Sequence, residues 1–90
     1  MKFEDCQKLE SNGKIEEASK CYKEYLTINP DSYLAYCNLG KIYAKKQNYI
    51  KAIKFFLIAK KINNKDRLIY FYIGLSYEKI GDLLNAQKYY

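Results

Sequence analysis

The sequence contains no histidine and no tryptophan, and it has one proline and four glycines. Without histidine, the side chain most often used as a general base and as a metal ligand is missing. So little proline and glycine leaves no flexible linker or low-complexity tract, so we expect residues 1–90 to form a single domain. No apolar run approaches the ~18 residues that a membrane-spanning helix needs.

Catalytic motifs are missing as well. The sequence has no glycine-rich phosphate loop and no cysteine beside a plausible base. The acidic pair Glu16 and Glu17 stands at the expected start of a helix, where the helix dipole favours negative charge. We therefore expect the chain not to be an enzyme, and we expect no catalytic residues, no cofactor and no metal site.

The three cysteines, Cys6, Cys21 and Cys37, are odd in number, and their spacings match no zinc-binding pattern. We interpret them as small core or surface residues. A redox role stays open, because it needs a neighbour that lowers the thiol pKa, which the sequence does not show. The first residues, MKFEDCQKLES, lack the apolar core of a signal peptide, so we expect a cytoplasmic location.

Positive charge is concentrated in the middle third of the chain. Residues 33–66 hold eight lysines and one acidic residue, whereas residues 1–32 hold five lysines and seven acidic residues. A basic patch can attract nucleic acid, an anionic membrane or an acidic peptide. The charge alone does not choose among these partners.

One pattern recurs three times at a spacing of 34 residues. The segments EDCQKLESNGKIEEA, NLGKIYAKKQNYIKA and YIGLSYEKIGDLLNA begin at residues 4, 38 and 72. Within each copy the apolar residues follow steps of three and four, which is typical of amphipathic helices. The copies span residues 1–32, 33–66 and 67–90, the last incomplete. The predicted helices are 2–12, 15–28, 33–46, 49–62, 67–80 and 83–90.

Gly40 and Gly74 fall inside predicted helices, where glycine costs about 1 kcal/mol relative to alanine. The apolar stripe continues past both glycines, so we expect them to allow close helix packing rather than to end a helix. The small residues Ala52, Ala59 and Ala86 are expected to supply the facing surface.

These residues resemble the tetratricopeptide repeat family, whose pattern is Trp-x2-Leu-Gly-x2-Tyr, then Ala-x3-Phe, then Pro. The resemblance extends over the entire chain and is carried best by Tyr36, Leu39, Gly40, Tyr43, Ala52, Phe56 and Ala59. The first copy departs from the pattern, with Lys2, Asp5 and Cys6 at the Trp, Leu and Gly positions. The resemblance implies an all-α solenoid of antiparallel helix pairs, about 2.7 repeats in a right-handed superhelix.

The resemblance also implies a protein-protein interaction module, part of a larger scaffold or adaptor, that binds a peptide in a concave groove. The first helix of each pair lines that groove in this family. The expected peptide-binding residues are Leu34, Cys37, Asn38, Lys41, Lys45, Leu68, Phe71, Tyr72 and Leu75. Ala44, Glu78 and Lys79 lie on the same face. Apolar side chains beside lysines suit a partner with apolar and acidic residues, and we expect no membrane partner.

Family members that bind heat-shock chaperone C-termini hold the terminal carboxylate with a clamp of lysine, arginine and asparagine. In this sequence only Asn38 matches the clamp. The other clamp positions hold Phe3, Gln7, Leu68 and Tyr72, which cannot make charge-assisted hydrogen bonds to a carboxylate. We therefore expect no chaperone carboxylate clamp.

Two alternatives stay open. The basic middle copy allows an RNA-binding helical-repeat module, although lysine greatly outnumbers arginine, the residue favoured for base contacts. The second alternative is self-association. The last helix lacks a covering neighbour, so the chain is either a piece of a longer array or is covered by another molecule, which includes a second copy. The residues expected in such a homodimer are Leu83, Leu84, Tyr89 and Tyr90.

Overall fold

The computed structural model describes residues 2–90, and this part of the chain folds into six helices without a strand. Every predicted helix is confirmed, with each end within one residue of the expected position. The helices are α1 (Phe3–Ser11), α2 (Ile15–Ile28), α3 (Tyr33–Lys45), α4 (Tyr49–Ile62), α5 (Arg67–Lys79) and α6 (Leu83–Tyr89).

Local capping explains where four of these helices begin. The side chains of Ser32, Asn48, Asp66 and Asp82 each accept a hydrogen bond from a backbone N–H in the first turn of the helix that follows. Such a cap satisfies one of the N–H groups that a helix start leaves without a partner. The boundaries are therefore encoded by the few residues around each turn.

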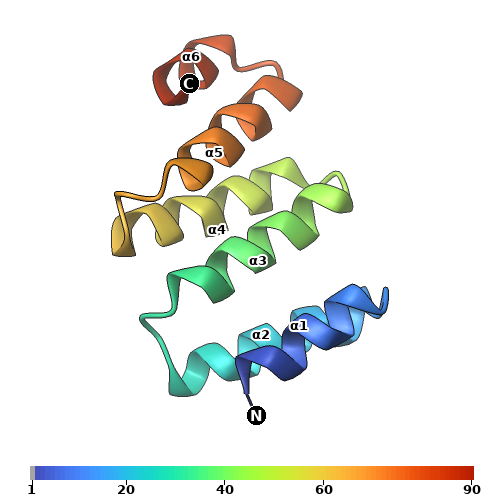
Figure 1. Ribbon diagram of the computed structural model, residues 1–90. Helices are drawn as coiled ribbons and strands as arrows, with labels where there is room; N and C mark the ends of the chain where they lie inside the picture. Colours follow the sequence, from blue (N-terminus) through green and yellow to red (C-terminus); the bar gives the residue numbers. More distant parts are fainter. Residues whose placement is uncertain (1) are drawn as a thin grey trace.

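The helices form three hairpins that stack in chain order, and each helix packs against the next one. Figure 1 shows α4 between α3 and α5, and the two chain ends at opposite ends of the stack. The molecule is elongated, with extents of 39 × 24 × 17 Å. One core runs through the hairpins and includes Tyr22, Leu39, Ile42, Phe56, Ile69 and Ile73. The chain is thus an all-α helical-repeat solenoid.

Gly40 and Gly74 are sites of close packing, as expected, but the facing groups are mainly aromatic rings. A Cβ atom on Gly40 would lie 2.6 Å from the Phe56 ring, and one on Gly74 would lie 2.8 Å from the Tyr90 ring. Of the alanines expected to face these glycines, Ala86 approaches Gly74 through its backbone oxygen at 3.3 Å. The missing side chain therefore makes room for an aromatic residue from the second helix of the same hairpin.

Among residues 2–90, no helix is both long and apolar enough to cross a membrane.

Candidate functional site

A pocket of about 350 Å³ lies between α3 and α5 and has α4 at its base. We call it the α3–α5 pocket. The rings of Phe56 and Tyr72 stack in it, with centroids 5.4 Å apart and planes 14° apart. It is lined by Lys41, Ala44 and Lys45 of α3, Tyr49 and Phe56 of α4, and Tyr72, Leu75, Ser76 and Lys79 of α5.

The charge of this pocket is positive. Three lysines line it, and none of its lining residues is acidic. The Nζ of Lys41 lies 5.2 Å from the centroid of the Tyr72 ring, a cation–π arrangement that holds the ammonium group beside the apolar base. Lys45 and Lys79 are exposed to solvent. An apolar base with ammonium groups around it can hold a bulky apolar side chain that has a carboxylate close by.

Four of the expected peptide-binding residues come together here: Lys41, Lys45, Tyr72 and Leu75. Leu34 and Leu68 lie in the first turns of α3 and α5 and are 47% and 60% exposed, but neither lines this pocket. Ala44 and Lys79, which share the predicted face, do line it.

Phe71 belongs to a different hollow. Its ring lies 6.0 Å from that of Tyr72 and 6.2 Å from that of Tyr90. It lines a second pocket of about 550 Å³ between α5 and α6, together with Arg67, Tyr70, Lys88, Tyr89 and Tyr90. We call this the α5–α6 pocket. The expected groove is therefore divided, because Tyr90 reaches back from the end of the chain to the side of Phe71.

The prediction that Cys37 lines the groove is wrong, because Cys37 is buried in the core with only 6% of its surface exposed. Its short side chain ends within the packed interior, whereas Phe71, at the same position one repeat later, reaches the surface. Burial is also the main cause that raises the pKa of the Cys37 thiol, so the group stays protonated at neutral pH. We remove Cys37 from the candidate groove.

Asn38 is engaged within the protein. Its side-chain amide donates to the hydroxyl of Tyr22 at 3.1 Å, and that hydroxyl donates to Oε1 of Glu10 at 2.7 Å. The Tyr22 hydroxyl thereby connects α1, α2 and α3. Burial, followed by the hydrogen bond to Glu10, raises the pKa of Tyr22 far above its usual value.

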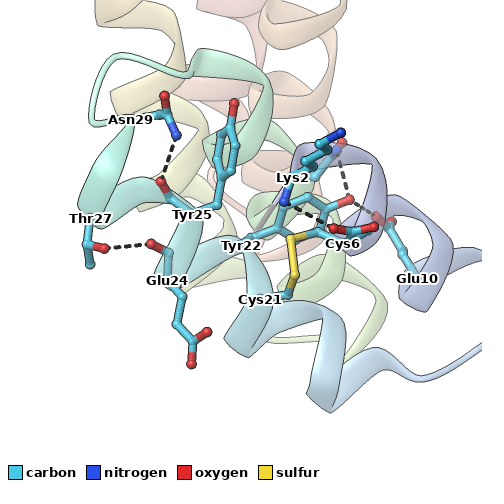
Figure 2. Close-up of a disulfide and its surroundings, with 11 residues drawn as sticks. Lys2, Cys6, Glu10, Cys21, Tyr22, Glu24, Tyr25, Thr27 and Asn29 are labelled. Atoms are coloured by element: carbon cyan, nitrogen blue, oxygen red, sulfur yellow. Dashed lines mark hydrogen bonds between the residues drawn. A yellow bond between two sulfur atoms is a disulfide. The ribbon is translucent and has the colours of Figure 1, made fainter.

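Cys6 and Cys21 form a disulfide that joins α1 to α2, with Cα atoms 5.4 Å apart (Figure 2). Sequence reasoning missed this pair, because spacing alone does not show which side chains face each other. The signal that could have revealed it is the repeat register. Cys6 occupies the glycine position, and Cys21 directly precedes the aromatic residue, Tyr22, that packs toward that position in the other repeats.

The residues expected in self-association divide into two groups. Leu83 and Leu84 are exposed, at 62% and 84%. The ring of Tyr89 stacks on that of Tyr77 at 5.9 Å, and the hydroxyl of Tyr90 donates to Glu78 at 2.6 Å. The two leucines therefore offer an exposed apolar surface on α6, whereas Tyr90, although 61% exposed, is held by its hydrogen bond to Glu78.

Other lysines gather around Tyr43, outside the α3–α5 pocket. The Nζ atoms of Lys23, Lys46 and Lys51 lie 5.4, 5.5 and 4.9 Å from its ring centroid. Lys23 also donates to the Tyr43 hydroxyl at 2.8 Å, which is the main cause that lowers the pKa of Tyr43. Lys46 pairs with Glu16. Two lysines of the middle repeat, Lys46 and Lys51, are therefore engaged within the protein. Within the described chain, no group of three or more Cys, Asp or Glu side chains is placed to hold a metal ion.

Two family models match the chain. The one described as TPR repeat matches residues 9–47, and the one described as tetratricopeptide repeat matches residues 33–66. Together they extend over residues 9–66, more than half of the chain.

Solved structures show the same fold. The second TPR of Spaghetti (RPAP3), bound to the HSP90 peptide SRMEEVD, aligns with a TM-score of 0.90 at 22% identity. That alignment covers 96% of this chain and 80% of the other. The structure of MamA aligns with a TM-score of 0.90 at 25% identity, over 93% of this chain and 49% of MamA. With three hairpins in the expected register, the chain belongs to the tetratricopeptide repeat family.

Proposed function

We propose that the chain binds an extended peptide of a partner protein in the α3–α5 pocket, as part of a larger scaffold or adaptor. Tetratricopeptide repeat chains are protein-interaction modules, and the pocket gives this chain a specific place for a ligand. One observation carries the proposal: Lys41, Lys45 and Lys79 surround the stacked rings of Phe56 and Tyr72.

The chemistry of the pocket defines the peptide. Its volume of about 350 Å³ accommodates one bulky apolar side chain. Because no acidic residue lines the pocket, carboxylates beside that side chain would meet three ammonium groups without competition. The proposed ligand is therefore an apolar residue flanked by aspartate or glutamate.

Selection from a library of acetylated, amidated peptides tests this proposal. We expect the selected peptides to be enriched in acidic residues next to a large apolar residue. Lys45→Glu should weaken their binding about tenfold, because it places a like charge beside the carboxylates. Lys54→Glu is the matched control: it makes the same charge change at an exposed lysine of the same repeat, outside the pocket. Selected peptides without acidic residues, or an equal loss in both variants, would contradict the proposal.

The peptide SRMEEVD, which the RPAP3 domain binds, combines apolar and acidic residues, so it distinguishes two modes of binding. We propose that this chain does not hold a terminal carboxylate, because the Asn38 amide is bonded to Tyr22. Phe3, Gln7, Leu68 and Tyr72 supply no cation at the other clamp positions. Peptides selected in the amidated form should bind equally well with a free C-terminus. A tenfold gain from the free carboxylate would show that a clamp exists.

A second candidate function is self-association through α6. Leu83 and Leu84 expose apolar side chains on the short helix α6, which favours a contact with another copy or another repeat. Sedimentation over a range of concentrations tests this. A dimer that Leu84→Glu dissociates would support the proposal, and a monomer at every concentration would exclude it.

We propose that the chain is located in the cytoplasm, as the sequence indicates. Disulfides are uncommon in cytosolic proteins, because glutathione and thioredoxin keep thiols reduced there. A cytoplasmic location predicts that Cys6 and Cys21 are mostly reduced in protein extracted from cells with rapid thiol blocking, and a fully oxidised pair would contradict it.

A further inference from the structure

The first repeat joins its two helices differently from the other two. Position 6 of the chain corresponds to Gly40 and Gly74, where the absence of a side chain lets the rings of Phe56 and Tyr90 approach. The corresponding aromatic residue of the first repeat is Tyr22. Because Cys6 carries a side chain, the Tyr22 ring does not face a glycine in the first repeat. A covalent bond from Cys6 to Cys21, the neighbour of Tyr22, is present instead.

Noncovalent contacts also hold α1 on α2. Phe3 packs against the rings of Tyr22 and Tyr25, each at a centroid distance of 5.6 Å, and Glu10 accepts the hydrogen bond from Tyr22. Helix α1 has only nine residues, and at its start the Asp5 carboxylate accepts a hydrogen bond from the Lys2 backbone N–H at 3.1 Å. Isolated helices of this length are marginal in water, so α1 depends on what attaches it to α2.

We propose that the Cys6–Cys21 disulfide is a redox-controlled attachment of α1 to the repeat stack. In the oxidised form α1 stays packed on α2 and covers Tyr22, which has no exposed surface. In the reduced form α1 separates readily, Glu10 leaves the Tyr22 hydroxyl, and Tyr22 becomes accessible next to Asn38. The oxidation state thereby decides whether the first repeat is complete.

The reaction is a thiol–disulfide exchange with an external dithiol such as dithiothreitol. A thiolate of the dithiol attacks one cysteine sulfur, the S–S bond breaks, and a mixed disulfide forms. The second thiolate of the dithiol then attacks the mixed disulfide and closes the oxidised dithiol ring. Two electrons and two protons reach Cys6 and Cys21, which become thiols. Both cysteines are buried, at 0% and 3% exposure, so the first attack requires that α1 opens.

Hydrogen exchange of the full chain, with and without dithiothreitol, tests the proposal. Closing a loop of this length restricts the open chain strongly, so reduction should raise the exchange rate of α1 amides on the order of a hundredfold. The amides of α4 and α5 should not change. The double variant Cys6→Ala, Cys21→Ala should exchange like the reduced protein and should not respond to dithiothreitol.

A second variant tests whether α1 can be held on α2 without any cysteine. The double change Cys6→Gly, Cys21→Phe installs the residues of the middle repeat, Gly40 and Phe55, at the equivalent positions. We expect it to protect α1 in the presence and absence of dithiothreitol, because the Tyr22 ring can then approach the glycine. Alkylation under denaturing conditions, after oxidation with glutathione disulfide, should modify Cys37 alone. Three alkylated cysteines, or equal α1 exchange in both redox states, would overturn the proposal.

Discussion

The hydroxyl of Tyr22 donates a hydrogen bond to Glu10 across the first hairpin, and Tyr90 and Glu78 form the same bond across the third, at 2.7 and 2.6 Å. In the middle repeat the equivalent residues are Phe56 and Ala44. Neither can take part in such a bond, and both line the α3–α5 pocket. The pocket thus exists where the middle repeat lacks the glutamate that the other two repeats place on this face.

Ala44→Glu should therefore abolish ligand binding without unfolding the chain. The new carboxylate would occupy the pocket and pair with its lysines, as a bound acidic residue is proposed to do. We expect at least a tenfold loss of affinity for the selected peptides, measured by titration calorimetry, and an unchanged thermal midpoint. Ala44→Gln is the control for side-chain volume. If Gln weakens binding as much as Glu, filling of the pocket rather than its charge decides the outcome.

Gly40→Ala should destabilise the chain by about 1–3 kcal/mol, because its Cβ would overlap the Phe56 ring in a closely packed core. Gly74→Ala should cost less. The ring that it meets belongs to Tyr90, which is 61% exposed at the chain end and can move away, whereas Phe56 is 1% exposed. Urea denaturation of both variants measures the difference. An equal loss at the two sites would show that the freedom of the facing ring to move does not decide the cost of the substitution.

Gln47→Gly should stabilise the chain by about 0.5–1 kcal/mol. Gln47 has φ of 63°, in the left-handed region, and its equivalents in the other repeats are Gly13 and Gly81 with φ of 78° and 83°. Glycine adopts this conformation without a steric penalty, whereas the Cβ atom of any other residue makes it unfavourable. Gln47→Ala serves as the control, because it removes the amide and keeps the strain. Equal urea midpoints for the Gly and Ala variants would contradict the explanation.

The helices could be predicted closely because their signals are local. The apolar stripe through Tyr36, Leu39 and Tyr43 has helical period, and Ser32 and Asp66 cap the helices that follow them. The period of 34 residues then fixed how the hairpins stack, so the fold followed from repetition.

The candidate site was predicted less completely, because it depends on how far each side chain extends and on which neighbours it contacts. Lys41 and Tyr72 lie on the predicted face and meet in the pocket, since helical periodicity determines a face. Cys37 lies on the same face and is buried, and Phe71 joins the α5–α6 pocket because Tyr90 reaches it. The pairing of Cys6 with Cys21 could not be predicted, because composition and spacing do not give the distance between two helices.

Alkaline pH should destabilise the chain through Tyr22. Burial and the Glu10 hydrogen bond raise its pKa in the folded state, whereas an unfolded tyrosine titrates near 10. Below about pH 10 both states hold the proton and the stability is fully present. Above that pH the unfolded chain loses the proton and the folded chain keeps it, so the free energy of unfolding falls as pH rises. Urea denaturation of the oxidised protein between about pH 9 and 11 measures this slope.

The variant Tyr22→Phe tests whether Tyr22 causes the fall in stability with rising pH. The variant loses the hydrogen bond to Glu10 and is expected to be about 1–2 kcal/mol less stable at neutral pH. Its stability should nevertheless fall less steeply above pH 10, because position 22 no longer titrates. All other residues are the same in the two proteins, so their contributions cancel in the comparison. Parallel stability curves for the two proteins would show that Tyr22 ionises as readily in the folded chain as in the unfolded one.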